Sequence, residues 1–139
     1  MSDFDDKNNT KIITDLATGQ SDWKTASSIT NSSDANYYPA ACCCWRYHTD
    51  GTKQGQWYLP ACGELGYIMP KFKQIQTSIN ALISAYGNSV GVQLESYPYW
   101  SSSENYYSNV NIINLGYGYV SNAYKSSAYY VRAWLRVGA

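Results

Sequence analysis

Residues 97–137 read YPYWSSSENYYSNVNIINLGYGYVSNAYKSSAYYVRAWLRV, and the fold class follows from this segment. Val, Tyr, Ile and Trp alternate there with Ser, Asn and Gly, and no helical period survives. The pattern predicts strands near 98–103, 109–115, 117–122 and 128–137, joined by short turns. Consecutive strands at this spacing favour an antiparallel sheet.

The middle third of the chain has helical spacing instead. Pro39 suits the first position of a helix, which turn chemistry ends at Asp50-Gly51. The apolar stripe of that helix consists of Ala40, Ala41, Cys44, Trp45 and His48. A second helix is expected to open at Pro60, with Glu64 near its positive end, until Pro70 interrupts it.

A third helix is expected over 71–86. Its apolar residues at spacings of three and four are Phe72, Ile75, Ile79, Leu82, Ile83 and Tyr86, and Gly87 stops it. Two to three helices followed by an antiparallel sheet predict an α+β domain. We expect a flexible lead-in over 1–10 and one domain over 11–139, which includes a short strand at 11–14.

Charge and hydropathy exclude several classes of protein. Ten basic and ten acidic side chains give a formal net charge of zero, so the chain has no overall electrostatic attraction for phosphate backbones or anionic membranes. No apolar run approaches the roughly 20 residues that span a bilayer, so membrane insertion is not expected. The acidic, polar start MSDFDDKNNTK shows no signal peptide.

Tyrosine is unusually frequent. The chain has 15 Tyr and 5 Trp against 2 Phe, so most aromatic rings carry a hydrogen-bonding group. Mixed with Ser, Gly and Asn, tyrosine suits a binding surface. Residues 97–139 contain only four charged side chains, so the usual protection of an edge strand is largely missing. The alternatives are a Tyr-rich core and a polar β-surface without a ligand.

Four cysteines occur, at Cys42, Cys43, Cys44 and Cys62. Buried free thiols are the leading interpretation, because three consecutive cysteines make a poor disulfide framework. Zinc bound by Cys44, His48 and Cys62, a Cys44–His48 nucleophile and a Cys43–Cys62 disulfide are the alternatives. No CxxC motif or second histidine supports a metal site, and we expect no cofactor.

Three ordered blocks of sequence then carry a resemblance to a known family. The blocks are WYLPACGEL (57–65), YWSSSE (99–104) and YVRA (130–133). Together they resemble the C-type-lectin-fold modules of bacterial surface proteins and of phage or bacterial variable proteins that retroelements diversify. The helix with Ala40, Cys44 and Tyr47 also fits, so the resemblance covers about residues 37–137. Formylglycine-generating enzymes share this broad fold, but no cysteine pair near the C-terminus matches theirs.

The resemblance implies a rigid scaffold that displays a variable ligand-binding surface. Retroelement mutagenesis in such proteins replaces adenines in AAY codons, which can yield Tyr, Ser, Gly or Val but never Lys, Glu, Gln or Trp. Between Glu104 and Val131, every residue except Lys125 belongs to the reachable set. The blocks 121–124 and 126–129 on either side of Lys125 look like two diversified Asn runs.

Strand alternation predicts which residues contact the ligand. Val110, Ile112 and Val120 are expected to face the core, with a bulge or turn near 114–116. The predicted contact residues are Tyr106, Tyr107, Asn109, Asn111, Ile113, Tyr117, Tyr119, Ser121, Asn122 and Tyr124, and Tyr129 and Ser126 extend the set.

Three further residue roles are expected. Trp57 and Trp100 are predicted core anchors, and Glu104 is expected to form a partly buried ion pair with Arg132. The motifs by which C-type lectins bind sugar through calcium are missing from the sequence, so metal-independent binding is expected.

The predicted function is a receptor-binding or adhesion module at a phage tail or on a bacterial surface. Its partner would be a protein or glycan ligand, and copies arrayed on a homo-oligomer or virion would supply avidity. The alternatives are a structural subunit of a pilus or phage tail and a formylglycine-generating-like enzyme. Catalysis is not expected, because His48 is the single histidine and no acid–base constellation is assembled.

Overall fold

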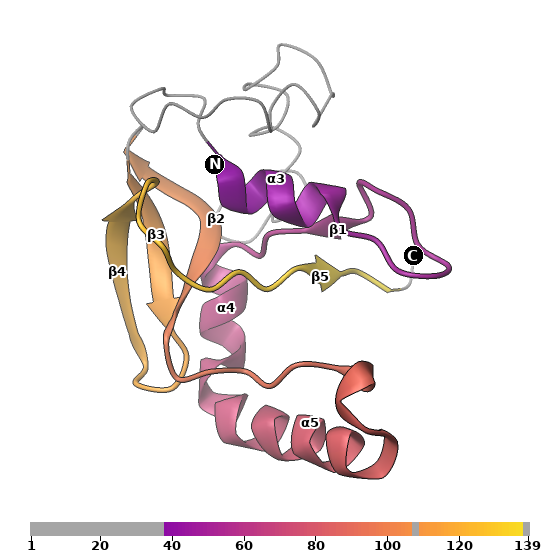
Figure 1. The fold of residues 1–139 in the computed structure, drawn as a ribbon. Coiled ribbons are helices and arrows are strands. Elements are labelled where there is room, and N and C mark those ends of the chain that lie inside the picture. The colour runs from indigo at the N-terminus through magenta and orange to yellow at the C-terminus, as the bar shows by residue number, and fades with distance from the viewer. Residues whose placement is uncertain (1–37, 107–108, 138–139) are drawn as a thin grey trace.

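The computed structural model of the protein describes residues 38–106 and 109–137, without the side chain of Tyr106. The expected lead-in, the expected strand at 11–14 and Tyr107 lie outside the described residues. In chain order the elements are α3 (Pro39–Arg46), β1 (Trp57–Tyr58), α4 (Cys62–Ile68), η1 (Met69–Lys71), α5 (Phe72–Tyr86), η2 (Asn88–Val90), β2 (Pro98–Tyr106), β3 (Asn109–Asn114), β4 (Tyr119–Tyr124) and β5 (Trp134–Leu135) (Figure 1). The α+β class is therefore confirmed.

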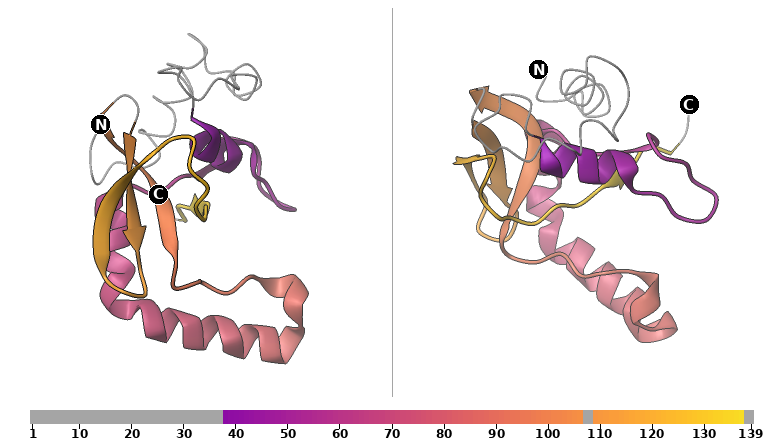
Figure 2. Two further views of the ribbon diagram at one scale, coloured as in Figure 1. Left: turned by 60° about the vertical axis from the view of Figure 1, so that its left-hand side comes forward. Right: turned by 45° about the horizontal axis from the view of Figure 1, so that its top comes forward.

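Two antiparallel sheets organise the strands. The larger has the order β2-β3-β4, and β1 pairs with β5 in the smaller (Figure 2). The predicted strand at 128–137 is wrong in extent, because only Trp134 and Leu135 form a ladder. Tyr130 adds an isolated parallel bridge to Tyr99. The chain thus returns along β2 before it reaches β1.

Local chemistry explains where the helices begin and end. Pro39 begins α3 as predicted, but the helix ends at Arg46 because Tyr47 is extended, four residues before Asp50. Helix α4 begins at Cys62 rather than at Pro60. Its start is capped by Glu64, whose carboxylate accepts a hydrogen bond from the N–H of Ala61. Helix α5 ends at Tyr86, before Gly87, whose φ of 89° favours glycine.

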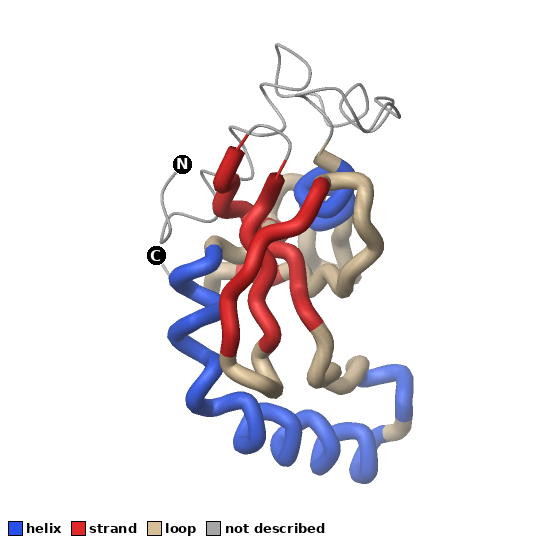
Figure 3. Tube along the Cα trace, turned by 90° about the vertical axis from the view of Figure 1, so that its left-hand side faces the viewer, coloured by secondary structure: helices blue, strands red, loops and turns tan. Residues whose placement is uncertain are grey.

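Different helices pack against the two faces of the larger sheet and cover part of each (Figure 3). On one face, Trp100 and Ile112 pack with Ala41 and Cys44 of α3. On the other face, Tyr99 and Ile113 pack with residues of α4 and α5, namely Leu65 and Phe72. Trp100 is a core anchor as predicted, whereas Trp57 is only half-buried and lies edge-on against Tyr47.

Candidate ligand-binding face

The register between β3 and β4 sorts their side chains into two faces. Opposed residues in an antiparallel pair share a face, and neighbours along a strand alternate. One set, on the α3 side, comprises Val110, Ile112, Asn114, Tyr119, Ser121 and Ala123. The other set comprises Asn109, Asn111, Ile113, Val120, Asn122 and Tyr124. The predicted contact residues of β3 and β4 therefore divide between the two faces.

Ile113 is a wrong prediction. Its side chain is fully buried, in the cluster with Leu65, Phe72 and Tyr99. The alternation places it correctly on the face of Asn109 and Asn111, but α4 and α5 cover that end of the face. The alternation within a strand cannot show that a helix from another part of the chain covers one of its residues.

Val120 is wrong in the opposite sense. It was expected in the core, but 54% of its surface is exposed. Strand β4 lies at the edge of the sheet, and Ala123 is its only half-buried residue. Tyr119 and Ser121 are exposed as predicted, although they lie on the α3 side.

Four predicted residues come together on the second face, and we call them the polar sheet face: Asn109, Asn111, Asn122 and Tyr124. Asn111 lies opposite Asn122, and Asn109 lies opposite Tyr124. The Asn109 amide nitrogen donates a hydrogen bond to the Asn122 amide oxygen over 3.2 Å. Asn109 and Asn111 are half-buried, whereas Asn122 and Tyr124 are exposed. The face presents amides and a phenol without charge.

A fixed turn presents the end of the hairpin. The predicted irregularity near 114–116 is a turn over 115–118, beyond buried Asn114. The Asn114 side chain accepts a hydrogen bond from the N–H of Tyr117 and donates one to the carbonyl of Ser96. Gly116 lies so close to Ser96 that a Cβ atom would approach it to 2.7 Å. Tyr117 itself is 78% exposed.

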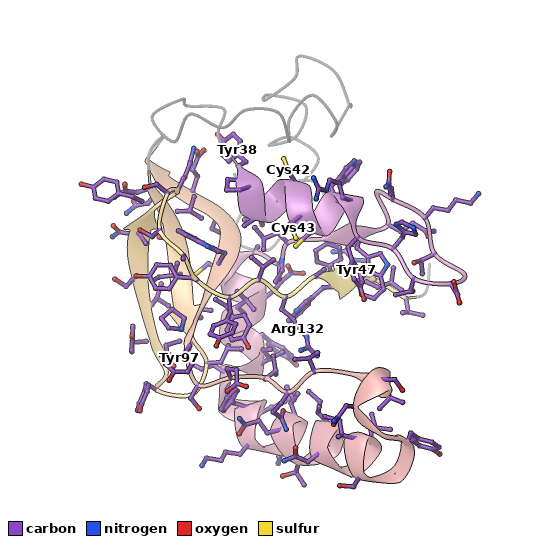
Figure 4. All side chains as sticks on the ribbon, in the orientation of Figure 1. Tyr38, Cys42, Cys43, Tyr47, Tyr97 and Arg132 are labelled. Atoms are coloured by element: carbon purple, nitrogen blue, oxygen red, sulfur yellow. The ribbon has the colours of Figure 1, made fainter. Side chains whose placement is uncertain are left out.

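The predicted ion pair between Glu104 and Arg132 is wrong. Glu104 pairs with Lys125, whose Nζ atom lies 2.6 Å from Oε1. Arg132 instead extends toward the segment before β2, where Nη1 donates to the carbonyl of Val92 over 2.7 Å (Figure 4). Lys125 was missed as a core residue because a lysine between Tyr and Ser in a turn normally lies in solvent.

Tyr38 contacts both members of that ion pair. Its hydroxyl donates a hydrogen bond to Glu104 Oε1 over 2.9 Å, and its ring lies 3.8 Å from Lys125 Nζ. Burial raises the pKa of the Tyr38 phenol, and the hydrogen bond to Glu104 raises it further. The Lys125 side chain is 2% exposed and that of Glu104 is 18% exposed. The network therefore ties the start of α3, β2 and the end of β4 together.

The cysteines do not form the constellations considered above. None of the four forms a disulfide, and Cys42 and Cys44 are buried as the leading interpretation expects, whereas Cys43 is exposed and Cys62 is half-buried. Cys44 is fully buried and burial raises its pKa, whereas His48 lies beyond the end of α3 in solvent, so the two form no dyad. The Cys42 and Cys43 sulfur atoms lie on opposite sides of α3 (Figure 4), and burial raises the pKa of Cys42 to about 11. Within residues 38–106 and 109–137, no group of three His, Cys, Asp or Glu could hold a metal ion.

Two hollows are not evident from the sequence. A small cavity of about 30 Å³ lies between α3 and β2, beside Tyr38, Trp100 and Lys125. The Ser102 hydroxyl oxygen in its wall is buried and has no hydrogen-bond partner among the described residues. A shallower hollow is lined by Tyr97, Pro98, Ala128, Tyr129 and Tyr130. Of the two residues that extend the predicted contact set, Tyr129 is 39% exposed and Ser126 is also exposed.

None of the helices in the described ranges is long and apolar enough to cross a membrane. Comparison of the chain with protein-family models, with curated proteins and with solved structures finds no match.

Proposed function

We propose that this chain is a C-type-lectin-like ligand-binding protein that a diversity-generating retroelement diversifies. In this proposal the helices and β2 form a constant scaffold. The polar sheet face, with Tyr117 at the end of the hairpin, recognises the ligand.

The position of Lys125 carries the proposal. It is the one residue between Glu104 and Val131 that adenine replacement in an AAY codon cannot produce. It is also buried and paired with Glu104, while Tyr124 before it and Ser126 after it are exposed. A scaffold residue inside a diversified segment has to stay constant, because a substitution would leave the Glu104 carboxylate without its cation. The codon bias and the burial thus mark the same residue.

The chemistry of the face suits a broad range of targets. Tyr124 and Tyr117 offer large contact areas at a low cost in side-chain entropy, and the asparagines adapt as donors or acceptors. The face carries no charge, so no single charge pattern is selected. We propose a protein or glycan on a cell surface as the ligand. Placement at a phage tail or on a bacterial surface would array several copies and supply avidity.

Binding without metal and without catalysis belongs to the same proposal. The neutral amides and phenols of the polar sheet face can recognise a ligand directly, by hydrogen bonds and stacking. The structure gives catalysis no support, because buried Cys44 and exposed His48 do not meet.

Nucleotide sequences of sibling isolates test the diversification. Substitutions should concentrate at adenine positions of the codons for the polar sheet face and Tyr117. The codons for Lys125 and for buried Ile112 and Ile113 should stay constant. An even spread of changes over the chain would contradict the proposal and favour a structural subunit.

Binding itself is tested on arrays of glycans and of cell-surface proteins. Replacing Tyr124 and Asn122 by Ala should abolish binding to whichever target the wild type selects. The matched control is Tyr67→Ala on α4, since Tyr67 is also a highly exposed tyrosine, at 72%, outside the sheet. If both variants bind as the wild type does, the polar sheet face is not the site.

A further inference from the structure

The free edge of β4 suggests a second interaction that does not depend on the proposed ligand. Within the described part of the chain, β4 pairs with β3 alone and is the outermost strand of its sheet (Figure 1). Five of its six residues are exposed and the sixth is half-buried. Its outer row of N–H and C=O groups is therefore open to pairing with another strand.

This edge lacks the usual features that prevent association. Natural edge strands carry Lys, Glu, Pro or a bulge that stops another strand from adding. The sequence of β4, YVSNAY, contains none of these residues. Its register with β3 runs without a shift from Tyr119 to Tyr124, whereas the register between β2 and β3 shifts twice. The strand is thus regular and uncharged over its whole length.

We propose that β4 pairs antiparallel with β4 of a second copy of this chain, across a two-fold axis. The two three-stranded sheets would then join into one of six strands. Opposed residues of an antiparallel pair share a face. With the axis perpendicular to the sheet, one residue of β4 must therefore lie opposite its own copy, and the axis passes midway between the two. An axis at Ser121 puts this small side chain opposite itself. It sets Tyr119 opposite Ala123, and Val120 opposite Asn122, of the second copy.

Charge and symmetry favour a second copy over a foreign strand. No charged side chain occurs between Tyr119 and Tyr124, and the formal net charge of the chain is zero, so two copies meet without repulsion. In the register centred on Ser121, each large residue lies opposite a small or polar one. The bonds that join the strands are backbone bonds, so the pairing tolerates changes of the side chains on β4. A dimer would also place two polar sheet faces in one continuous sheet.

Sedimentation of the full chain from low micromolar to near-millimolar concentration tests the dimer. The mass should rise from that of a monomer to that of a dimer. Hydrogen exchange of the β4 amides should slow over the same range. Ser121→Lys sets two like charges opposite each other on the axis and should weaken the dimer by about tenfold or more.

The matched control is Ser84→Lys, the same change on an exposed residue of α5 away from the sheet. It should dimerise as the wild type does, and both variants should keep the wild-type melting temperature at low concentration. A chain that stays monomeric throughout, as expected if a foreign strand is the partner, would overturn the proposal. So would equal dimerisation of the two variants. Neither outcome affects the proposed ligand binding, which a monomer can perform.

Discussion

The ammonium of Lys125 and the carboxylate of Glu104 lie 2.6 Å apart, and both side chains are largely buried. This pair joins β2 to the residue that directly follows β4. A buried pair of this kind is sensitive to the loss of one partner, because the other charge then remains in a poorly solvated place.

We therefore expect Lys125→Met to lower the free energy of unfolding by about 3 kcal/mol, measured by urea denaturation. The double variant Lys125→Met with Glu104→Gln should recover much of that loss, because no lone charge then remains. A double-mutant cycle gives the coupling between the two side chains. If Lys125→Met unfolds at the wild-type urea concentration, the pair has no structural role.

Adjacent serines of β2 allow a matched test of hydrogen bonding. The Ser103 hydroxyl accepts a hydrogen bond from the N–H of Cys62 at the start of α4, whereas the Ser102 hydroxyl has no partner in the part of the chain that the structure describes. Ser103→Ala should cost about 1 kcal/mol or more, because it leaves a helix N–H unsatisfied. Ser102→Ala should leave the stability unchanged or raise it. Equal losses in thermal unfolding would show that both hydroxyls are bonded.

Tyr38 predicts a dependence of stability on alkaline pH. Its pKa is raised above the ordinary value of 10, so above pH 10 the folded state binds more protons than the unfolded state. The advantage of the wild type over Tyr38→Phe should be complete below pH 10 and decrease as the pH rises beyond it. Comparing the two proteins cancels the titration of the cysteines, which both contain. Parallel stability curves for the two between pH 8 and 11 would contradict the predicted proton linkage.

The cysteines should differ in reactivity according to burial. Cys43 is exposed, Cys62 is half-buried, and Cys42 and Cys44 are buried with raised pKa values. A thiol reagent at pH 8 should label Cys43 first, and it should label Cys42 and Cys44 only after unfolding, because thiolates react and buried thiols are protonated. Mass spectrometry of the peptides identifies each site. Cys43→Ser should remove the fast phase, and a fast phase that persists would contradict this order.

Ile113 and Val120 lie opposite each other across β3 and β4, yet one is fully buried and the other is 54% exposed. Ile113→Ala should cost about 3 kcal/mol because it opens a cavity in the core. Val120→Ala should change the stability by about 0.5 kcal/mol at most. Chemical denaturation of the two variants measures the difference, and a comparable cost for both would refute the assignment of β4 as an exposed edge.

The two misassigned residues of this pair illustrate how far strand alternation reaches. Alternation assigns Asn109, Asn111 and Ile113 to one face of β3, and the register confirms that they share it. It does not say where on that face a covering helix ends. Ile113 lies under α4 and α5, while Asn109 and Asn111 at the other end of β3 are half-buried. For β3 the alternation was correct, but the assumption that one face is uniformly buried was wrong. For β4 the predicted face was wrong as well, because Val120 lies on the face of Ile113 and not on that of Val110 and Ile112.

Local patterns alone determined the α+β class, the three helices and three of the strands, because periodicity, proline, glycine and turn residues act within a few positions of themselves. Contacts between distant segments decided the rest. The partner of Glu104 is Lys125 rather than Arg132, β4 is an edge rather than a covered strand, and α4 and α5 bury Ile113. These facts depend on which surfaces meet in space, and the sequence around a residue does not show which distant residue will pack against it.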